Sequence, residues 1–281
     1  ETFIRTARKH WKKPFLSDIT EKRMTWGKAL VGLVALGEKL KTRTAGQSSV
    51  GIFLPPSVGG ACANLAAAVL GKVAVNLSYT ASESDRQYMI EQAGVQTILT
   101  SRQFLDKLNV RPQDLPDAVF LEDLFAELTS FEKQKAWLKA RFYPRRILAN
   151  ARGFHADDTA AILFSSGSSG RPKGVLLSHH NILSNLEAAL MVFRVQPGDK
   201  LCGILPFFHS FGLACTLWMP ILAGVPVCYA ANPLDGQKVG QIIHSEKATL
   251  LFATPTFLLN YYRRCPAEDF KTIRFIIAGA E

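Results

Sequence analysis

The chain has 281 residues, of which 48% are hydrophobic and 20% charged, and its formal net charge is +10. This balance excludes an intrinsically disordered chain, and the length suffices for one large or two ordinary domains with a substantial core. The basic excess leaves two explanations open, a solvated surface or an acidic partner or anionic ligand.

The first part of the chain alternates short apolar runs with helical patterns. Thr25 can cap the first helix, and Thr80 with Glu83 fits a capping box at the start of the third. The expected elements are helices over 25–40, 59–71, 82–94 and 101–108 and strands over 49–54, 73–77 and 95–99.

An irregular, charged stretch over about 109–154 is expected to precede a second run of alternation. That run predicts strands over 160–164, 200–205, 225–230, 249–253 and 274–278 and a helix over 179–193. Continuous apolar strands alternating with helices indicate an α/β fold with two mostly parallel sheets covered by helices. We expect two layered lobes, over about 1–150 and 151–281, with ligands bound beyond the carboxyl ends of the strands.

The segment over 201–234 contains no Asp, Glu, Lys or Arg, which raises the question of a membrane span. Pro206, Pro220, Pro226 and Pro233 interrupt it, whereas a spanning helix needs about 20 uninterrupted apolar residues. A buried strand–helix–strand unit is therefore the preferred interpretation.

Two basic clusters lie at RKHWKK (8–13), which includes Trp11, and at RFYPRR (141–146), which includes Tyr143. Such clusters can contact phosphates or anionic lipid. Neither accompanies a helix–turn–helix, zinc-finger or RNA-recognition pattern, so we expect no nucleic-acid partner.

The five cysteines are odd in number and form no motif, which favours buried thiols in a reducing, cytoplasmic compartment. The chain begins with Glu1 rather than Met and stops directly after the strand-like run FIIAGA. We therefore expect it to be a piece of a longer protein.

The stretch SSGSSGRPKG over 165–174 follows an expected strand and precedes VLLS and a helix. It does not fit the Walker, dinucleotide-binding or nucleophile-elbow patterns. Serine hydroxyls, glycines that let backbone amides turn inward, and a lysine charge suit a polyphosphate, and a plain surface turn is the alternative. The residues concerned are Ser165, Ser166, Gly167, Ser168, Ser169, Gly170 and Lys173.

All ten positions fit S/T-S/G-G-S/T-S/T-G-x-P-K-G, and the stretch resembles the phosphate-binding signature of adenylate-forming enzymes. LPFFHSFGL (205–213) and LFATPTFL (251–258) resemble two further signatures of that superfamily, and IIAGAE (276–281) resembles the segment that lines the adenine. NLSYTASESD, FLEDL and AGAE together resemble the synthetase half of the bifunctional acyl-acyl carrier protein synthetase / 2-acylglycerophosphoethanolamine acyltransferase.

The resemblance implies the large N-terminal domain of an adenylate-forming enzyme, without its small C-terminal domain. The implied activity is that of an acid–thiol ligase. ATP activates a fatty acid to an acyl-adenylate, and the acyl group passes to the thiol of acyl carrier protein or coenzyme A. The implied cofactors are ATP and Mg²⁺. A lysophospholipid would be a partner through an acyltransferase domain that this chain lacks, at the inner face of the cell membrane.

The resemblance also implies residue roles, with no protein metal ligand among them. His209 and Lys173 would be catalytic, and His209 would lie beside the substrate carboxylate and the α-phosphate, although a lone histidine can also be a satisfied core residue. Phe207, Phe208, Phe211 and Trp218 would be core residues or line an acyl tunnel. Ser165, Ser166, Gly167, Ser168, Ser169, Gly170 and Lys173 would hold the β- and γ-phosphates with Mg²⁺, and Gly279, Ala280 and Glu281 would border the adenine.

The family's pattern continues with a Tyr-Gly-x-Thr-Glu segment, a ribose-binding Asp, a hinge and a small domain that carries the adenylating Lys. The sequence stops before all of these, so we expect the 281-residue chain alone to be inactive. None of the six histidines fits the acyltransferase pattern H-x-x-x-x-D. The alternative function is a basic peripheral membrane or carrier-protein-binding module without catalysis.

Overall fold

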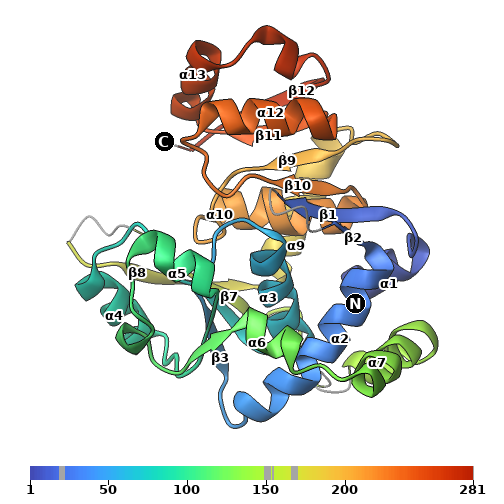
Figure 1. Cartoon of the computed structure of the whole chain (residues 1–281), viewed down its shortest axis with the longest axis vertical. Coiled ribbons are helices and arrows are strands. Elements are labelled where there is room, and N and C mark those ends of the chain that lie inside the picture. The colour runs from blue at the N-terminus through green and yellow to red at the C-terminus, as the bar shows by residue number, and fades with distance from the viewer. Residues whose placement is uncertain (19–22, 149–152, 154, 166–169, 281) are drawn as a thin grey trace. The chain divides into compact units, whose positions relative to one another are not determined.

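The computed structural model describes all residues except 19–22, 149–152, 154, 166–169 and 281. The described residues form two compact units, each built around a six-stranded sheet (Figure 1). The first unit contains residues 1, 28–54 and 59–181, and the second contains residues 2–27, 55–58 and 182–281. The predicted α/β class is confirmed.

The sheet of the first unit is parallel except for its last pair, β7 and β8, which is antiparallel. The parallel strands are short and largely buried, as expected for strands covered on both faces. In sheet order the strands are β6 (Ala118–Phe120), β5 (Ile98–Thr100), β3 (Ser49–Ile52), β4 (Val73–Asn76), β7 (Thr159–Ser165) and β8 (Lys173–Ser178).

The core of the first unit contains a cluster of buried apolar side chains that includes Phe53, Val75 and Ile98. The buried amides of Asn64 and Asn76 donate hydrogen bonds to each other's oxygens at 3.0 and 2.8 Å, so neither is left unsatisfied. The helices are α2 (Trp26–Arg43), α3 (Val58–Val69), α4 (Glu83–Gln92), α5 (Arg102–Leu108), η1 (Pro112–Asp114), α6 (Leu121–Ala126), α7 (Ser130–Phe142), α8 (Pro144–Ile147) and α9 (His179–Val192), which continues into the second unit.

The predicted capping box at the start of α4 is wrong by two residues. Ser82 is the N-cap, and its hydroxyl accepts from the backbone N–H of Asp85 at 3.1 Å. Thr80 instead shares a hydrogen bond with the Ser78 hydroxyl at 3.0 Å. A cap forms where the backbone is already extended and the hydroxyl reaches the third helical residue, and Ser82 meets both conditions.

The stretch over 109–154 is not irregular where the structure describes it, because it holds β6 and several helices. In α7 the buried residues are Ala136 and Ala140, so the helix packs through small side chains and shows no long apolar stripe toward the core. The true capping box here is Thr129 with Glu132, whose side chains each accept from the other's backbone N–H.

β7 lies in the first unit, although the sequence analysis assigned its residues to the second lobe. Ala161 and Ile162 of β7 pair in parallel with Ala74 and Val75 of β4. Through this pairing the β7–β8 hairpin belongs to the sheet of the first unit, and the first residues of α9 belong to the same unit.

The sheet of the second unit is also parallel except for one edge pair, β1 with β2. Its edge comes from the N-terminal residues, for which the sequence predicted no strand; Leu16 of β1 pairs with Val227 of β10. In sheet order the strands are β12 (Phe275–Ala278), β11 (Leu250–Ala253), β9 (Leu201–Gly203), β10 (Val227–Tyr229), β1 (Pro14–Asp18) and β2 (Arg23–Thr25).

The uncharged segment over 201–234 forms the expected buried strand–helix–strand unit, from β9 to β10. Across the described part of the chain, no helix combines the length and apolarity that crossing a bilayer requires. The helices of the second unit are α1 (Thr2–Lys9), α10 (Ser210–Gly212), the π-helical turn η3 (Leu213–Trp218), α11 (Met219–Ala223), α12 (Gly236–Glu246), α13 (Pro255–Arg264) and η4 (Ala267–Phe270).

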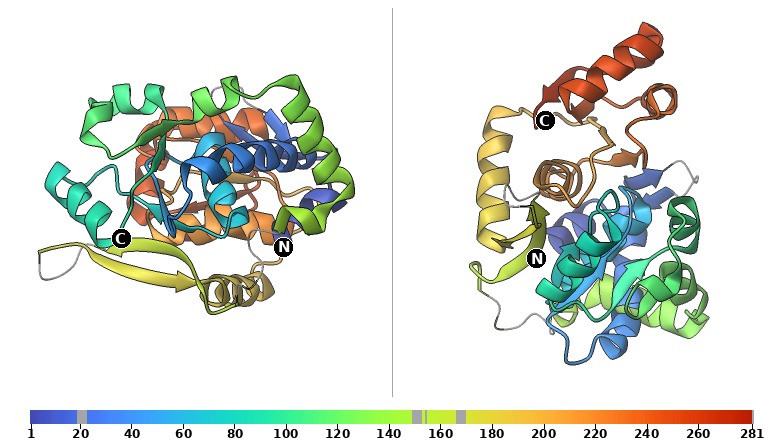
Figure 2. Two further views of the ribbon diagram at one scale, coloured as in Figure 1. Left: turned by 90° about the horizontal axis from the view of Figure 1, so that it is seen from below. Right: turned by 90° about the vertical axis from the view of Figure 1, so that its left-hand side faces the viewer.

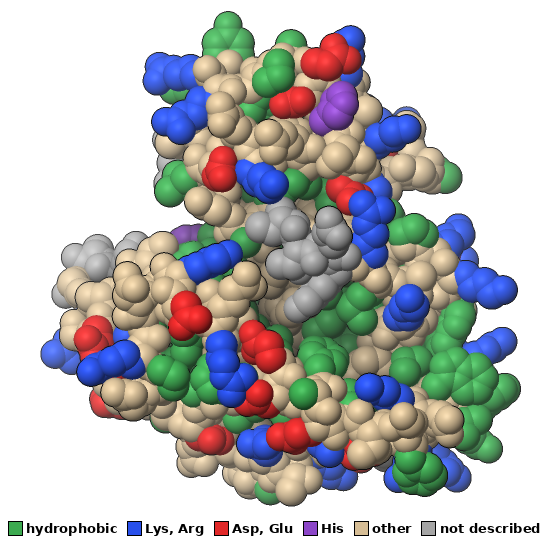
Figure 3. Space-filling view, viewed as in Figure 1, with side chains coloured by type: hydrophobic (Ala, Val, Ile, Leu, Met, Phe, Trp, Pro, Cys, Tyr) green, Lys and Arg blue, Asp and Glu red, His purple; other side chains and the backbone are tan. Residues whose placement is uncertain are grey.

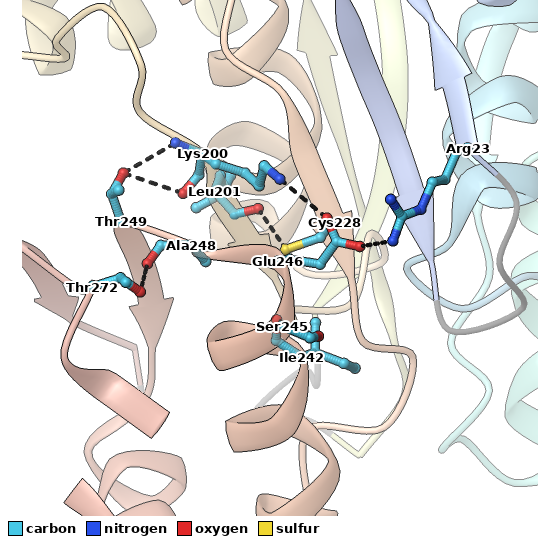
Figure 4. A network of polar contacts seen from close by, with 10 residues as sticks. All are labelled: Arg23, Lys200, Leu201, Cys228, Ile242, Ser245, Glu246, Ala248, Thr249 and Thr272. Atoms are coloured by element: carbon cyan, nitrogen blue, oxygen red, sulfur yellow. Dashed lines mark hydrogen bonds and ion pairs between the residues drawn. The ribbon is translucent and has the colours of Figure 1, made fainter. Parts of the chain in front are cut away.

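Polar contacts in the second unit join β2, the end of α12 and the residues that lead into β9 and β11 (Figure 4). Glu246, at the end of α12, accepts from Arg23 at 3.0 Å and from the ammonium of Lys200 at 3.1 Å. Thr249 accepts from the backbone N–H of Lys200 at 3.0 Å.

The buried carboxylate of Asp199 adds to these contacts. It accepts from the Thr249 hydroxyl at 2.8 Å and from Arg274 Nε at 2.8 Å, and it also pairs with Arg274 Nη2. The backbone N–H of Gln196 donates to it at 2.6 Å. Burial raises the pKa of Asp199, but the hydrogen bonds from Arg274, Gln196 and Thr249 together outweigh burial and lower it.

Asp199→Asn is expected to lower the free energy of unfolding by ~2 kcal/mol near neutral pH, because it removes a charge that accepts several hydrogen bonds. A carboxyl group whose pKa is lower in the folded protein than in the unfolded chain stabilises the fold at any pH above its unfolded pKa. That stabilisation is lost as the pH falls through the folded-state pKa. Urea unfolding should therefore show the variant and wild type converging below about pH 4. A stability difference that stays constant down to that pH would contradict the electrostatic explanation.

Candidate functional site

The predicted phosphate-binding stretch forms the end of the β7–β8 hairpin in the first unit. The two strands run side by side (Figure 2), and Ser165 pairs with Lys173 at the point where the loop begins. Ser165, Gly170 and Lys173 are exposed. Ser166, Gly167, Ser168 and Ser169 lie outside the described residues.

Two glycines determine the backbone path from this loop into β8. Gly170 has φ +91°, a conformation that L side chains rarely adopt, with open space around it. A Cβ on Gly174 would lie 3.3 Å from the Phe164 ring, so this glycine lets β8 pass close to that ring. Between them, the Arg171 guanidinium stacks over the Tyr88 ring of α4 at 5.0 Å. The loop's end is thus held by backbone conformation and by one cation–π contact.

The electrostatics of the hairpin suit an anion. Residues 159–178 include Arg171 and Lys173 and no Asp or Glu. Arg171 is engaged with Tyr88, whereas the exposed Lys173 extends from the first pair of the strand ladder. A lysine ammonium next to serine hydroxyls provides donors and positive charge for phosphate oxygens.

The hairpin is followed at once by α9. Ser178 and Asn181 exchange hydrogen bonds at the helix start, with each side chain accepting from the other's backbone N–H at 3.0 and 3.1 Å. The backbone N–H of His179 donates to the carbonyl of Asp158 at 3.2 Å, and burial lowers the His179 pKa. These contacts fix the start of α9 directly after the hairpin.

The second group of predicted residues lies at the carboxyl edge of the sheet in the second unit. His209 follows β9 and is the N-cap of α10, and the Leu213 N–H donates to its carbonyl at 2.8 Å. Its exposed ring lies 4.4 Å from that of Phe208, centroid to centroid. Partial burial lowers the pKa of His209, so its imidazole is neutral near pH 7.

Phe211 brings this segment beside the end of β12. A Cβ on Gly279 would lie 3.6 Å from Cζ of Phe211, and the Phe211 ring meets that of Phe252 edge-on at 6.0 Å. The Gly279 N–H donates to the carbonyl of Ala253 at 3.2 Å. The structure thus places the predicted residue Gly279 next to the LPFFHSFGL segment at one edge of the sheet, where parallel sheets bind ligands.

Of the remaining predicted residues at this edge, Ala280 has a left-handed backbone with φ +56°, and Glu281 lies outside the described residues. The sequence analysis did not identify Thr254, which caps α13 by accepting from the Phe257 N–H at 3.2 Å. It named Phe211 but did not predict that this ring lies next to Gly279. The signal for Thr254 was its place directly before a proline at a strand end.

The aromatic residues of LPFFHSFGL, together with Trp218, differ in how far they are buried. Phe207 and Phe208 are buried, and Phe207 meets the Tyr229 ring edge-on at 5.6 Å. Phe211 and Trp218 are partly exposed. Core positions are therefore confirmed for Phe207 and Phe208, while an acyl-tunnel role for any of the four stays a prediction.

Gly212 and Thr216 pack the helix that follows His209 against Leu205 and Pro206, which come after β9. Gly212 lies so close to Pro206 that a Cβ would come within 2.0 Å of the Pro206 carbonyl oxygen. The Thr216 hydroxyl donates to the carbonyl of Gly212 at 2.6 Å. Pro220 has no N–H for the Thr216 carbonyl, and the Tyr229 hydroxyl donates to that oxygen at 3.0 Å. The backbone around His209 is thereby fixed.

Within the described ranges, no three His, Cys, Asp or Glu side chains come together as a group that could hold a metal ion. A cation that accompanies a nucleotide is commonly bound through phosphate oxygens and water with one or two carboxylates. The hairpin of the first unit and the carboxyl edge of the second are thus two groups of residues suited to an anion and a flat ring, respectively.

The chain resembles known proteins along most of its length. The model of the AMP-binding enzyme family matches residues 3–281. The mitochondrial medium-chain acyl-CoA ligase ACSF2 of Rattus norvegicus is 26% identical over 281 residues, covering 90% of this chain and 45% of the relative. The long-chain-fatty-acid–CoA ligase of Bacillus subtilis is 33% identical over 129 residues, covering 44% and 22%.

Two solved structures share the fold. The Bacillus subtilis O-succinylbenzoate coenzyme A synthetase with ATP and magnesium has a TM-score of 0.79 at 20% identity, covering 99% of this chain and 54% of that one. The N-terminal domain of FACL13 from Mycobacterium tuberculosis has a TM-score of 0.80 at 22% identity, covering 100% and 69%. The expected fold, that of a large N-terminal domain, is confirmed. The chain spans about half the length of the curated relatives that it matches along most of its own length.

Proposed function

Because the chain belongs to the AMP-binding enzyme family, we propose that it is the nucleotide- and acyl-binding part of a fatty acid–thiol ligase. In the first step a carboxylate oxygen attacks the α-phosphorus of ATP and pyrophosphate leaves. In the second step a thiol attacks the acyl-adenylate carbonyl and AMP leaves. The observation that carries the proposal is the ten-residue signature at the end of the β7–β8 hairpin, with Lys173 exposed at its base.

The residues of the hairpin would bind the β- and γ-phosphates. Ser165 would donate its hydroxyl, and the charge of Lys173 would offset the repulsion between two anionic reactants. The loop residues Ser166, Gly167, Ser168, Ser169 and Gly170 share this proposed role. Mg²⁺ supplies charge neutralisation at the phosphates, and the acid-free segment over 159–178 suits an anion that brings its own cation.

The residues at the carboxyl edge of the second sheet would bind the rest of the nucleotide. Gly279, Ala280 and Glu281 would border the adenine, since Gly279 has no side chain on the face that Phe211 approaches. His209, exposed and neutral near pH 7, would donate or accept one hydrogen bond at the substrate carboxylate or the α-phosphate.

In a longer parent that forms the acyl-adenylate, His209→Ala is expected to slow that step about 100-fold, the cost of losing one positioned donor in the transition state. The affinity for ATP should change less than about twofold, because the proposed contacts to the β- and γ-phosphates come from the β7–β8 hairpin. Since burial lowers its pKa, any fall in rate due to protonation of His209 should begin only at a pH below the usual imidazole range and vanish in the variant. His244→Ala, which removes an exposed imidazole from α12, serves as the control. Equal losses in the two variants would refute a specific role for His209.

Two lines of support favour different thiol acceptors. The named relatives are coenzyme A ligases, which supports coenzyme A. The likeness to acyl-acyl carrier protein synthetases supports acyl carrier protein instead, with a lysophospholipid as the final acceptor in a longer protein at the inner face of the membrane. Mass spectrometry of the thioester formed with each thiol separates the two.

ATP–pyrophosphate exchange with a C16 fatty acid tests the proposed function. It should be measured on the 281-residue chain, where we expect no exchange, and on any longer parent, where we expect fatty-acid-dependent exchange. Exchange by the short chain would show that it is competent alone. A longer parent without exchange for fatty acids of any length would refute the ligase proposal.

A further inference from the structure

One face of α7, in the first unit, exposes apolar side chains that contribute nothing to the core. Phe131, Leu138 and Phe142 are 74%, 49% and 58% exposed. Their spacing of seven and four residues places them on a single helix face, here called the α7 stripe. The buried residues of the helix, Ala136 and Ala140, lie on the opposite side. Exposed clusters of large apolar side chains mark interaction surfaces.

Two further aromatic residues adjoin the α7 stripe. Trp137 is 45% exposed and meets the Phe142 ring edge-on at 5.9 Å. Tyr143 is 51% exposed, and the Arg146 guanidinium lies 4.9 Å from its ring centroid. Tryptophan and tyrosine, with an apolar body and a polar tip, favour the boundary between hydrocarbon and water.

The same surface is strongly basic. Residues 130–148 contain six Lys or Arg and one acidic residue, Glu132. Hydrogen bonds from the Thr129 backbone, from Lys39 and from the Thr129 hydroxyl lower the pKa of Glu132 to about 2, so it is engaged within the fold. Hydrophobic and basic side chains are exposed together over α7 (Figure 3). Of the basic residues, Lys139 pairs with Glu38 at 2.6 Å, and the exposed ones are Lys133, Lys135, Arg141, Arg145 and Arg146.

We propose that α7 and α8 dock the protein on an anionic lipid bilayer, with the α7 stripe inserted at the headgroup level and the basic residues against lipid phosphates. Charge complementarity selects an anionic partner. The large exposed aromatic and aliphatic side chains favour lipid over an acidic soluble protein, because insertion removes them from water. The lipid surface would hold the protein where long-chain fatty acids partition, but the docking does not depend on the proposed ligase activity.

Vesicle flotation of the 281-residue chain tests the proposal. We expect binding to vesicles of phosphatidylcholine with about one third phosphatidylglycerol, weaker binding to pure phosphatidylcholine, and at least tenfold weaker binding in about 0.5 M salt. The apolar variant Phe131→Ser/Leu138→Ser/Phe142→Ser should bind the anionic vesicles at least tenfold more weakly. The charge variant Arg145→Glu/Arg146→Glu should lose the preference for anionic lipid.

Matched controls remove similar side chains elsewhere. Met191→Ser/Tyr262→Ser deletes two side chains that are 85% and 86% exposed, and Arg263→Glu/Arg264→Glu reverses two exposed charges of α13. Both should bind within about twofold of wild type. All the replaced side chains are exposed, so melting curves should coincide; the single change Phe131→Ser, at the most exposed stripe position, serves where the triple variant unfolds.

The proposal is overturned if the chain does not bind anionic vesicles, if the α7 variants bind as wild type does, or if the controls lose binding equally. Acyl carrier protein provides the competing partner class. Binding to that acidic protein that is lost in the α7 variants, with vesicle binding unchanged, would reassign the surface to a protein partner.

Discussion

Lys173→Ala is expected to weaken ATP binding by the 281-residue chain about 10-fold and to reduce ATP–pyrophosphate exchange in a longer parent about 100-fold or more. Lys173 is exposed at the base of the signature loop, where its ammonium can meet phosphate oxygens. Loss of one charge weakens ground-state binding, and charge that develops in the transition state makes the loss of rate larger. Titration of a fluorescent ATP analogue and exchange assays measure the two effects separately.

The control for this prediction is Lys107→Ala, which removes an exposed lysine from the last turn of α5 in the same unit. Both variants should melt within a few degrees of wild type, because exposed side chains contribute little to stability. Lys173→Arg should restore ATP binding in part, since it keeps the charge but not the compact shape of the ammonium. Unchanged ATP binding in Lys173→Ala would show that the hairpin does not bind the phosphates.

The central strands of both sheets could be predicted because their burial leaves a direct trace. β3 and β11 are buried at every position, and their residues read as short continuous apolar runs. The uncharged segment over 201–234 was interpreted correctly for the same reason. Its prolines and glycines excluded a spanning helix, and burial on both faces excluded charge.

The elements that could not be predicted depend on distant partners or small buried faces. β1 has few residues, and its pairing with β10 joins positions more than 200 residues apart, which local patterns do not encode. α7 buries alanines and exposes aromatic residues. Helix prediction from apolar periodicity assumes that the large apolar side chains face the core, and in α7 they face away from it. The same inversion marks its outer face as an interaction surface.

For the candidate site, the sequence predicted the type of ligand but not which residues pack against one another. The residue types of the signature loop indicated a polyphosphate, and the structure places its ends on two paired strands. Phe211 as the neighbour of Gly279 could not be foreseen, because β9 and β12 are separated in the sheet by β11 and lie far apart in sequence. Their proximity follows from the parallel order of the strands, whose carboxyl ends share one edge.

Gly212→Ala is expected to lower the free energy of unfolding by about 3 kcal/mol, although alanine is the better helix former. A Cβ at this position would lie 2.0 Å from the carbonyl oxygen of Pro206 and 2.7 Å from its carbonyl carbon. Both atoms belong to the backbone, so no side-chain rotation can relieve the clash. A shift of the helix away from Pro206 would also break the contact of the Thr216 hydroxyl with the Leu205 carbonyl, at 3.4 Å.

Gly37→Ala in α2 is the matched control, because a Cβ there would meet only Leu70 Cδ2, at an ordinary 3.8 Å. Gly37→Ala should raise the free energy of unfolding by up to about 1 kcal/mol, so the two substitutions are predicted to change stability in opposite directions. Urea unfolding followed by circular dichroism measures both. Since His209 begins the helix that Gly212 ends, any Gly212→Ala protein that still folds should also have altered the environment of His209. If the Gly212→Ala protein has wild-type stability and an unchanged His209 imidazole resonance, the backbone around Pro206 can accommodate a Cβ at little cost.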